Sequence, residues 1–246
     1  MELKETYSPL NCPKPFAEGI WIFDGPVIRM DLGPFKVPFP TRMTVVRLAD
    51  GTLWVHSPIA PDEGLFAAVD ALGPVRRLVA PNSIHYWYMA DWLERYPEAQ
   101  SYAVPDLATT AKRPFRIDHP LADGARFGWE SDIGWLLVPG TRVSEAVFHV
   151  PAAKTVILVD LIENFEAAKL SNPFMRFMLR LVGGLDPNGM APLDLRMTFR
   201  PKRQQVRERL QRVVDWQPEK VIMAHGRVYD RAGTDELRRA FRWAIG

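Results

Sequence analysis

The sequence predicts one domain of the mixed α/β class. Short runs of β-branched and aromatic residues alternate with amphipathic stretches at helical spacing, and each hairpin-rich half is followed by helices. No linker-like stretch divides the chain, so residues 1–246 are expected to form a single domain. Hairpin-rich halves that are each followed by helices favour two packed sheets flanked by helices, although pattern alone establishes only a mixed α/β domain.

Composition excludes several classes of protein. A hydrophobic content of 47% and a charged content of 24% are ordinary for a globular domain, and the net charge of +2 lacks the clustered excess of a nucleic-acid-binding protein. The single cysteine, Cys12, excludes an internal disulfide framework, and neither a signal peptide nor an apolar run of about 20 residues is visible. We therefore expect a cytoplasmic protein that takes a small-molecule substrate or ligand, without nucleic acid or membrane insertion. The oligomeric state is left open.

The first half of the chain is expected to be rich in strands. Asp50-Gly51 between two apolar runs predicts a hairpin, and residues 61–72 form an amphipathic pattern that Gly73-Pro74 ends. The expected strands cover residues 19–31, with a break into two at Asp24-Gly25-Pro26, and residues 41–48, 52–55, 75–79 and 101–104.

The second half combines strands with longer helices. Strands are expected at residues 134–138, 144–150, 155–159 and 219–224, and helices at 201–216 and 234–243 with Thr234 as N-cap. The helix at 201–216 is rich in arginine, but one apolar face predicts a solvated amphipathic helix rather than a nucleic-acid patch. Residues 172–185, with Arg176 and Arg180 one turn apart, are expected to pack on the domain, cover a pocket or join a partner.

Residues 139–164 are the most informative stretch for function. The continuous run at residues 155–159 is typical of a buried strand, and Asp160 follows it directly. A carboxylate buried there without a partner costs several kcal/mol. Asp160 is therefore solvated in a cleft or meets a cation, a metal or backbone N–H groups; the structural alternative is a cap on a helix that starts near Ile162.

This stretch resembles a segment of the metallo-β-lactamase superfamily: Gly-His-Thr-Pro-Gly, a strand, Pro-x-x-Lys, a buried strand and an Asp. Gly140, Pro151, Lys154 and Asp160 fall at those places without a gap. Near the other end, Met223-Ala224-His225-Gly226 resembles the late strand-His-Gly of the same superfamily. The resemblance implies a four-layer αββα sandwich and places the chain in a motif-poor branch, a domain of unknown function.

Two departures reduce the metal site that the resemblance implies. Thr141 stands where the superfamily has a ligand histidine, and residues 80–92 keep only His85 of the Thr-His-x-His-x-Asp-His loop. The remaining metal ligands would be His85, Asp160 and His225, a set that suits one zinc, iron or manganese ion. Asn82 would be a weak neutral ligand.

Other candidates carry structural alternatives. Glu145 and His149 share one face of a strand and are possible additions to the site, but Glu145 could equally pair with Arg142, and His149 and His56 could be structural. His85 could be a half-buried histidine at a helix start, and His225 could do no more than form a hydrogen bond within a turn.

Two functions follow from these residues. The first is a metal-dependent hydrolase with a reduced metal site, in which metal-assisted attack is helped by Glu145 or His85 as the proton-transferring group. The alternative is a non-catalytic, metal-free descendant of the fold that binds a small molecule or a protein partner, with Tyr86, Trp87 and Tyr88 lining an apolar pocket. A separation of His85, Asp160 and His225 beyond about 8 Å, too far for a shared ion, favours the alternative.

Overall fold

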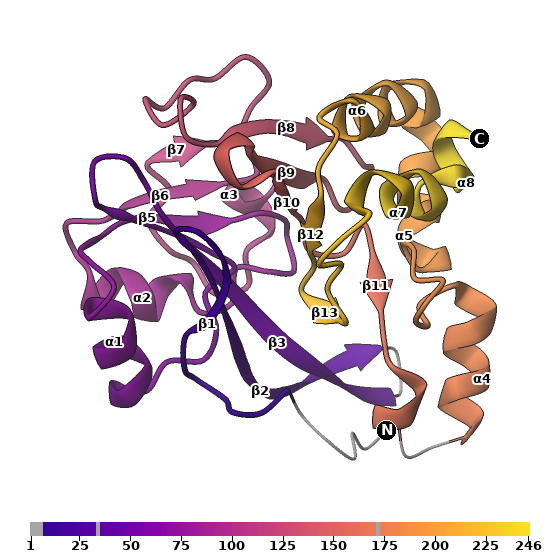
Figure 1. Ribbon diagram of the computed structural model, residues 1–246, viewed down its shortest axis with the longest axis horizontal. Helices are drawn as coiled ribbons and strands as arrows, with labels where there is room; N and C mark the ends of the chain where they lie inside the picture. The colour runs from indigo at the N-terminus through magenta and orange to yellow at the C-terminus, as the bar shows by residue number, and fades with distance from the viewer. Residues whose placement is uncertain (1–6, 33–34, 171–172) are drawn as a thin grey trace.

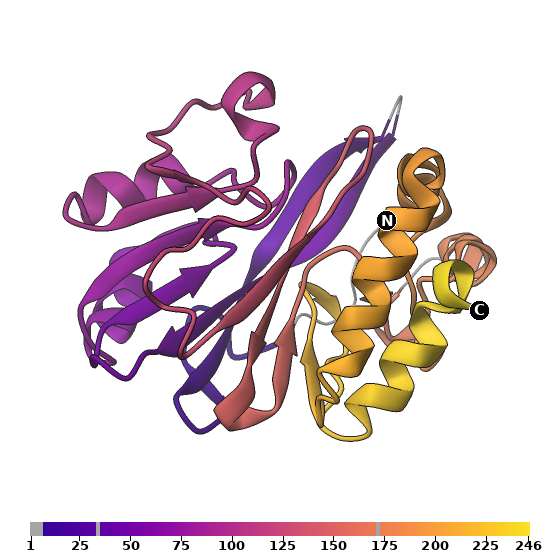
Figure 2. The same cartoon turned by 90° about the horizontal axis from the view of Figure 1, so that it is seen from above.

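Two β-sheets lie face to face and carry helices on their outer sides. The computed structural model describes residues 7–32, 35–170 and 173–246. Viewed from above, the molecule shows helix, sheet, sheet and helix layers in succession (Figure 2). The expectation of a four-layer αββα sandwich is therefore confirmed.

The first sheet contains strands from the N-terminal half, in the order β1-β2-β3-β4-β5-β6-β7 (Figure 1). Neighbours from β1 to β4 are antiparallel, and those from β4 to β7 are parallel. The strands are β1 (Lys14–Ala17), β2 (Ile20–Leu32), β3 (Phe35–Arg47), β4 (Leu53–His56), β5 (Val75–Ala80), β6 (Gln100–Ala103) and β7 (His119–Pro120).

The second sheet has the order β12-β10-β9-β8, and a short parallel pair, β11-β13, lies beside it. The parallel pairing of β10 with β12 brings the chain near residue 160 next to the chain near residue 225. The strands are β8 (Gly134–Val138), β9 (Glu145–Val150), β10 (Thr155–Ile157), β11 (Glu163–Asn164), β12 (Lys220–Ile222) and β13 (His225–Gly226).

Helices cover the two outer faces. On the first sheet lie α1 (Glu63–Asp70) and α2 (Met89–Arg95), with the short α3 (Leu107–Thr110) nearby. The other outer layer holds α4 (Pro173–Val182), α5 (Leu193–Phe199), α6 (Arg203–Asp215), α7 (Gly233–Ala240) and α8 (Arg242–Ile245). Single 3-10 turns, η1 (Pro151–Ala153), η2 (Ala167–Lys169) and η3 (Arg200–Lys202), complete the chain.

Aromatic side chains fill the space between the sheets. Trp54 of β4 meets Phe148 of β9 edge-on, with ring centroids 4.8 Å apart, and Trp129 packs against both rings. Each of these side chains is almost fully buried. Such contacts add to the burial of apolar area and hold the two sheets in one relative position.

Two expectations about local structure were wrong. β2 is continuous, because the chain absorbs Asp24-Gly25-Pro26 as an irregularity between Gly25 and Ile28, and a proline in such a bulge removes no ladder donor. Thr234 is not the N-cap of α7; Ala232 takes that place in a left-handed conformation, and the Thr234 hydroxyl donates to the Pro218 carbonyl.

The two amphipathic stretches become α6 and α4. α6 buries the expected apolar face, Val206, Leu210, Val213 and Val214, against the second sheet. α4 leaves Phe177, Met178 and Leu181 exposed, while Leu179 packs against a small cluster around Phe165. Residue 172 of the predicted segment lies outside the described residues. Among the helices described, none combines the length and the apolar character needed to span a bilayer.

Buried His56 gives the native state a pH dependence. Burial, with a smaller contribution from the charge of His85, lowers the pKa of His56 to about 3, whereas an unfolded histidine titrates near 6.5. The unfolded chain therefore binds more protons below about pH 6.5, and the free energy of unfolding falls as pH drops from 6.5 towards 3.

We expect the wild type to lose about 3 kcal/mol more of its free energy of unfolding than His56→Leu between pH 7 and pH 4. Urea unfolding at a series of pH values measures the difference. If the free energy of unfolding changed with pH by the same amount in both proteins, this role of His56 would be contradicted.

Candidate metal centre

Three side chains from separate parts of the sequence meet at one end of the sheets. His85 stands in the turn between β5 and α2, Asp160 follows β10, and His225 is the first residue of β13. All three side chains are nearly buried, at 6–9% exposure. The predicted ligand set is thus brought together, although the stretches that carry it are up to 140 residues apart.

The three facing atoms form a nearly equilateral triangle. Asp160 Oδ1 lies 3.3 Å from His85 Nε2 and 3.3 Å from His225 Nε2, and the two nitrogens are 3.2 Å apart. Zinc bonds of about 2.0–2.1 Å in a tetrahedron separate the ligand atoms by about 3.3–3.4 Å. The geometry fits one small divalent ion. The ligand atoms lie much closer together than the separation of about 8 Å that would have favoured a metal-free protein.

The charge state of Asp160 suits a ligand. Burial raises its pKa, but the two histidines outweigh burial and hold the pKa of this carboxyl well below its usual range. Asp160 is therefore an anion at neutral pH. An oxygen anion beside two imidazole nitrogens is a donor set for zinc, iron or manganese.

Each histidine is oriented by its second ring nitrogen. His225 Nδ1 lies 2.9 Å from the carbonyl oxygen of Pro40, which can only accept, so Nδ1 carries the proton and Nε2 offers its lone pair in the neutral ring. His85 Nδ1 lies 2.8 Å from Ser57 Oγ. Partners of this kind fix the ring of a metal-binding histidine and its tautomer.

Ser57 and Pro40 were not found from the sequence. Pro40 belongs to β3 and Ser57 directly follows β4, and only the packing of the chain brings them to the histidines. One local signal exists in the structure: Ser57 has a φ of 54°, in the left-handed region that non-glycine residues seldom adopt. Strained backbone of this kind clusters at functional sites, and here it aims the hydroxyl at His85.

Asn82 connects the parts of the centre. Its Oδ1 accepts hydrogen bonds from the backbone N–H groups of Ile84 and His85, and its Nδ2 donates to Asp160 Oδ2 at 2.7 Å. Asn82 is fully buried. The amide therefore holds the His85 turn against Asp160, and its place is behind the ligands rather than among them.

Glu145 supports Asp160 from behind. Its carboxylate accepts from the backbone N–H groups of Val159 at 2.9 Å, Asp160 at 3.0 Å and Leu161 at 3.4 Å. These bonds end β10 two residues earlier than the sequence predicted, because the amides turn to Glu145 and leave the sheet. Burial and the nearby charge of Asp160 raise the pKa of Glu145, and the amides oppose that shift. This geometry gives Glu145 a positioning role, and its predicted proton transfer stays a prediction.

A cavity of about 260 Å³ opens beside Asp160 and His225. Besides the two ligands, its walls combine apolar side chains with three ionisable ones: Arg142, Glu163 and Asp194. Glu163 is 7% exposed, and burial raises its pKa to about 8, although His225 lowers it. Sequence reasoning missed Glu163, which lies opposite His225 in the β11-β13 pairing.

The remaining candidates lie elsewhere. His149 stacks on Trp216 with ring centroids 5.1 Å apart, and His56 stacks on Trp54 between the sheets. Thr141, which stands in place of a ligand histidine, binds the carbonyl of Thr198 through its N–H and its hydroxyl and so ties its loop to α5.

The expected aromatic pocket is not part of the cavity beside the metal centre. Tyr86 is buried against Phe115 and accepts a hydrogen bond from the N–H of Lys112, and Trp87 is 47% exposed. Tyr88 also lies outside the walls of that cavity.

Comparison with known proteins supports the fold and leaves the activity open. The family model of a domain of unknown function (DUF4336) matches residues 17–117. No curated protein matches the sequence.

Solved metallo-β-lactamases match nearly the whole chain. The DIM-1 enzyme exposed to ceftazidime is 14% identical with a TM-score of 0.61, and the match covers 99% of this chain and 98% of that one. TMB-1 is 11% identical with a TM-score of 0.62, covering 95% and 98%. FIM-1 from Pseudomonas aeruginosa, in its mono-zinc form, is 14% identical with a TM-score of 0.59, covering 95% and 96%. The chain therefore has the metallo-β-lactamase fold.

Replacement of Ser57 by alanine is expected to weaken metal binding. The His85 ring loses the partner of its Nδ1, and loss of such a partner typically lowers metal affinity by about 10–100-fold. Competition with a zinc-sensitive dye measures the affinity. Ser83→Ala, in the turn that carries His85, is the matched control and should bind the metal as tightly as the wild type does. A metal affinity of Ser57→Ala equal to that of Ser83→Ala would exclude this role of Ser57.

Proposed function

We propose that this protein is a metal-dependent hydrolase that uses one divalent ion held by His85, Asp160 and His225. The observation that carries the proposal is the triangle of ligand atoms, 3.2–3.3 Å on each side, beside a cavity that two of the three ligands line. Three protein ligands with one open position are typical of catalytic zinc sites, whereas structural sites use four.

The metal would supply Lewis acidity towards a carbonyl or phosphoryl oxygen of the substrate. Two imidazoles and one carboxylate fit zinc, iron and manganese, in agreement with the sequence-based expectation. Asn82, Ser57 and Glu145 keep the ligand atoms in place without contacting the substrate cavity themselves. The sequence indicated that His85 could bind the metal or transfer a proton, and in this proposal His85 is a metal ligand.

The cavity suggests a small substrate. Its volume of about 260 Å³ lies just below the 300–1,000 Å³ of most ligand pockets. Phe39, Ile84 and Leu195 supply apolar wall, and Arg142, Glu163 and Asp194 supply polar groups that can orient a bound molecule. A compact substrate, or one end of a longer one, would occupy this space.

Hydrolysis assays with metal-loaded protein test the proposal. Chromogenic esters, lactams and phosphodiesters are offered to protein loaded with zinc, iron or manganese. We expect hydrolysis of at least one class, its loss with a chelator and its return with metal. Asp160→Asn keeps the shape but removes the anionic ligand, and should lower kcat/KM by about 100-fold or more.

Asp230→Asn, on the exposed surface, is the control and should leave kcat/KM unchanged. Activity that persists in Asp160→Asn would contradict the assignment of the site. Bound metal with no hydrolysis of any class would contradict the proposed hydrolase. Absence of both metal and hydrolysis would favour the alternative, a metal-free protein of this fold that binds a small molecule or a protein partner.

A further inference from the structure

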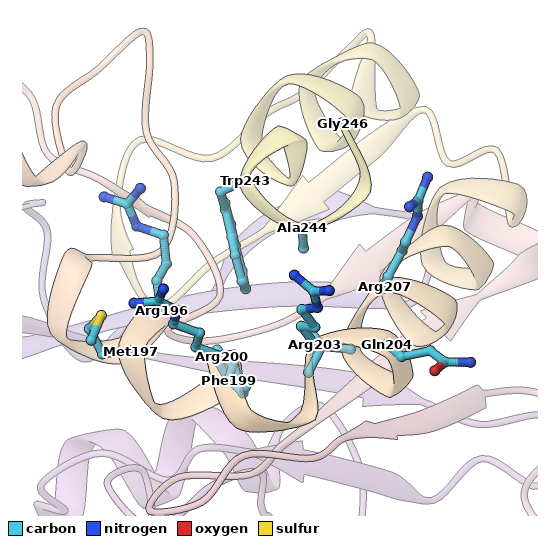
Figure 3. Close-up of a pocket in the computed structure, with 11 residues that line it drawn as sticks. Arg196, Met197, Phe199, Arg200, Arg203, Gln204, Arg207, Trp243, Ala244 and Gly246 are labelled. Carbon is cyan, nitrogen blue, oxygen red and sulfur yellow. The ribbon is translucent and has the colours of Figure 1, made fainter.

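A second cavity, of about 680 Å³, lies on the outer helical layer and is lined by arginines (Figure 3). They come from α5, η3 and α6, which follow one another almost without interruption. Although the 3-10 turn η3 separates α5 from α6, these arginines line the same pocket. The four are Arg196, Arg200, Arg203 and Arg207. The close-up shows Arg203 and Arg207 pointing from α6 towards α8, with Trp243 above the arginine stripe.

The positive charge of this arginine pocket is not balanced by neighbouring side chains. Among the described residues that line it there is no aspartate or glutamate. Arg200, Arg203 and Arg207 form no ion pair within the described parts of the chain, whereas Arg209, two residues further along α6, pairs with Asp123. The charges of these three arginines are thus not neutralised by an ion pair within the described residues.

Hydrogen-bond donors in the pocket also lack partners. Arg196 uses Nη2 for the carbonyl of Val182, but its buried Nε has no acceptor within the described residues. The indole N–H of Trp243 is buried and unpaired as well. Burial and the charge of Arg242 lower the pKa of Arg196. Unsatisfied buried donors and crowded like charges are both relieved by a bound anion with several acceptor oxygens.

The walls further restrict the ligand. Phe199 and Trp243 stack with centroids 5.9 Å apart and, with Met197, give one side of the pocket an apolar surface. The pocket of about 680 Å³, lined by arginines from two helices and the turn between them, has more room than one phosphate group needs. The guanidinium fork matches phosphate oxygens, and a row of such groups matches a row of phosphates.

We propose that the arginine pocket binds a compound that carries several phosphate groups, either free in solution or as the headgroup of a lipid. This pocket is distinct from the metal-site cavity, with which it shares no lining residue. The two lie on opposite sides of α5: Leu195 and Thr198 line the metal-site cavity, and Arg196 and Arg200 line the arginine pocket. The proposal does not depend on hydrolytic activity.

Calorimetric titration of the full chain with inorganic tripolyphosphate tests the proposal. We expect saturable binding that weakens as salt is added, and binding about tenfold weaker or more in the double variant Arg203→Gln/Arg207→Gln. Trp243→Phe, which removes the indole N–H and keeps an aromatic ring, should also weaken binding. The control Arg212→Gln/Arg231→Gln removes two positive charges at exposed positions outside the pocket and should bind within about twofold of the wild type.

Sedimentation with vesicles distinguishes the two sources of phosphate. Binding of tripolyphosphate with no preference for vesicles containing a phosphoinositide bisphosphate over phosphatidylcholine vesicles assigns the pocket to a free ligand. A preference that Arg203→Gln/Arg207→Gln removes assigns it to a lipid headgroup with several phosphates. Binding of neither probe, equal weakening in the control variant, or binding of a single-stranded RNA oligonucleotide alone would overturn the proposal. Circular dichroism of each variant confirms that a loss of binding is not a loss of fold.

Discussion

The arrangement of the metal centre depends on one buried carboxylate, that of Asp160, and on the groups that pair with it or donate hydrogen bonds to it. One oxygen faces two imidazole nitrogens at 3.3 Å, and the other accepts a hydrogen bond from Asn82. A buried carboxylate costs several kcal/mol unless it is paired and hydrogen-bonded, so the position of Asp160 requires these partners to be in place. The sheets meet at the edge where Asp160, His85 and His225 come together.

The supporting groups explain how three side chains can form a site of this shape. Glu145 accepts hydrogen bonds from three backbone N–H groups after β10 and so fixes the path of the chain through Asp160. The carbonyl of Pro40, in β3, and Ser57, which directly follows β4, fix the two imidazole rings. The ligands thus depend on both sheets, and one ion is the most that this described set is arranged to hold. Thr141 does not contribute to the ligand set and instead fastens its loop to α5.

Strand periodicity predicted a mixed α/β domain, and the resemblance of residues 139–164 and 223–226 to the metallo-β-lactamase superfamily predicted the four layers. The same resemblance indicated His85, Asp160 and His225, which the structure brings together. The sequence did not predict Ser57 or Glu163, since their importance arises from strands that pair or pack across long distances in the chain. The break expected at Asp24-Gly25-Pro26 was wrong for a similar reason: pairing with β3 on both sides of the irregularity keeps β2 one strand. The uncompensated arginine stripe was visible as composition, but the missing acidic partners could be recognised only in three dimensions.

Metal content per chain tests the central claim most directly. Untagged protein, purified without chelator, is analysed by elemental analysis beside Asp160→Ala and His225→Ala variants. The account predicts about one equivalent of zinc, iron or manganese in the wild type and loss of that metal in both variants. No metal in the wild type after reconstitution with each ion, or unchanged metal content in both variants, would contradict it.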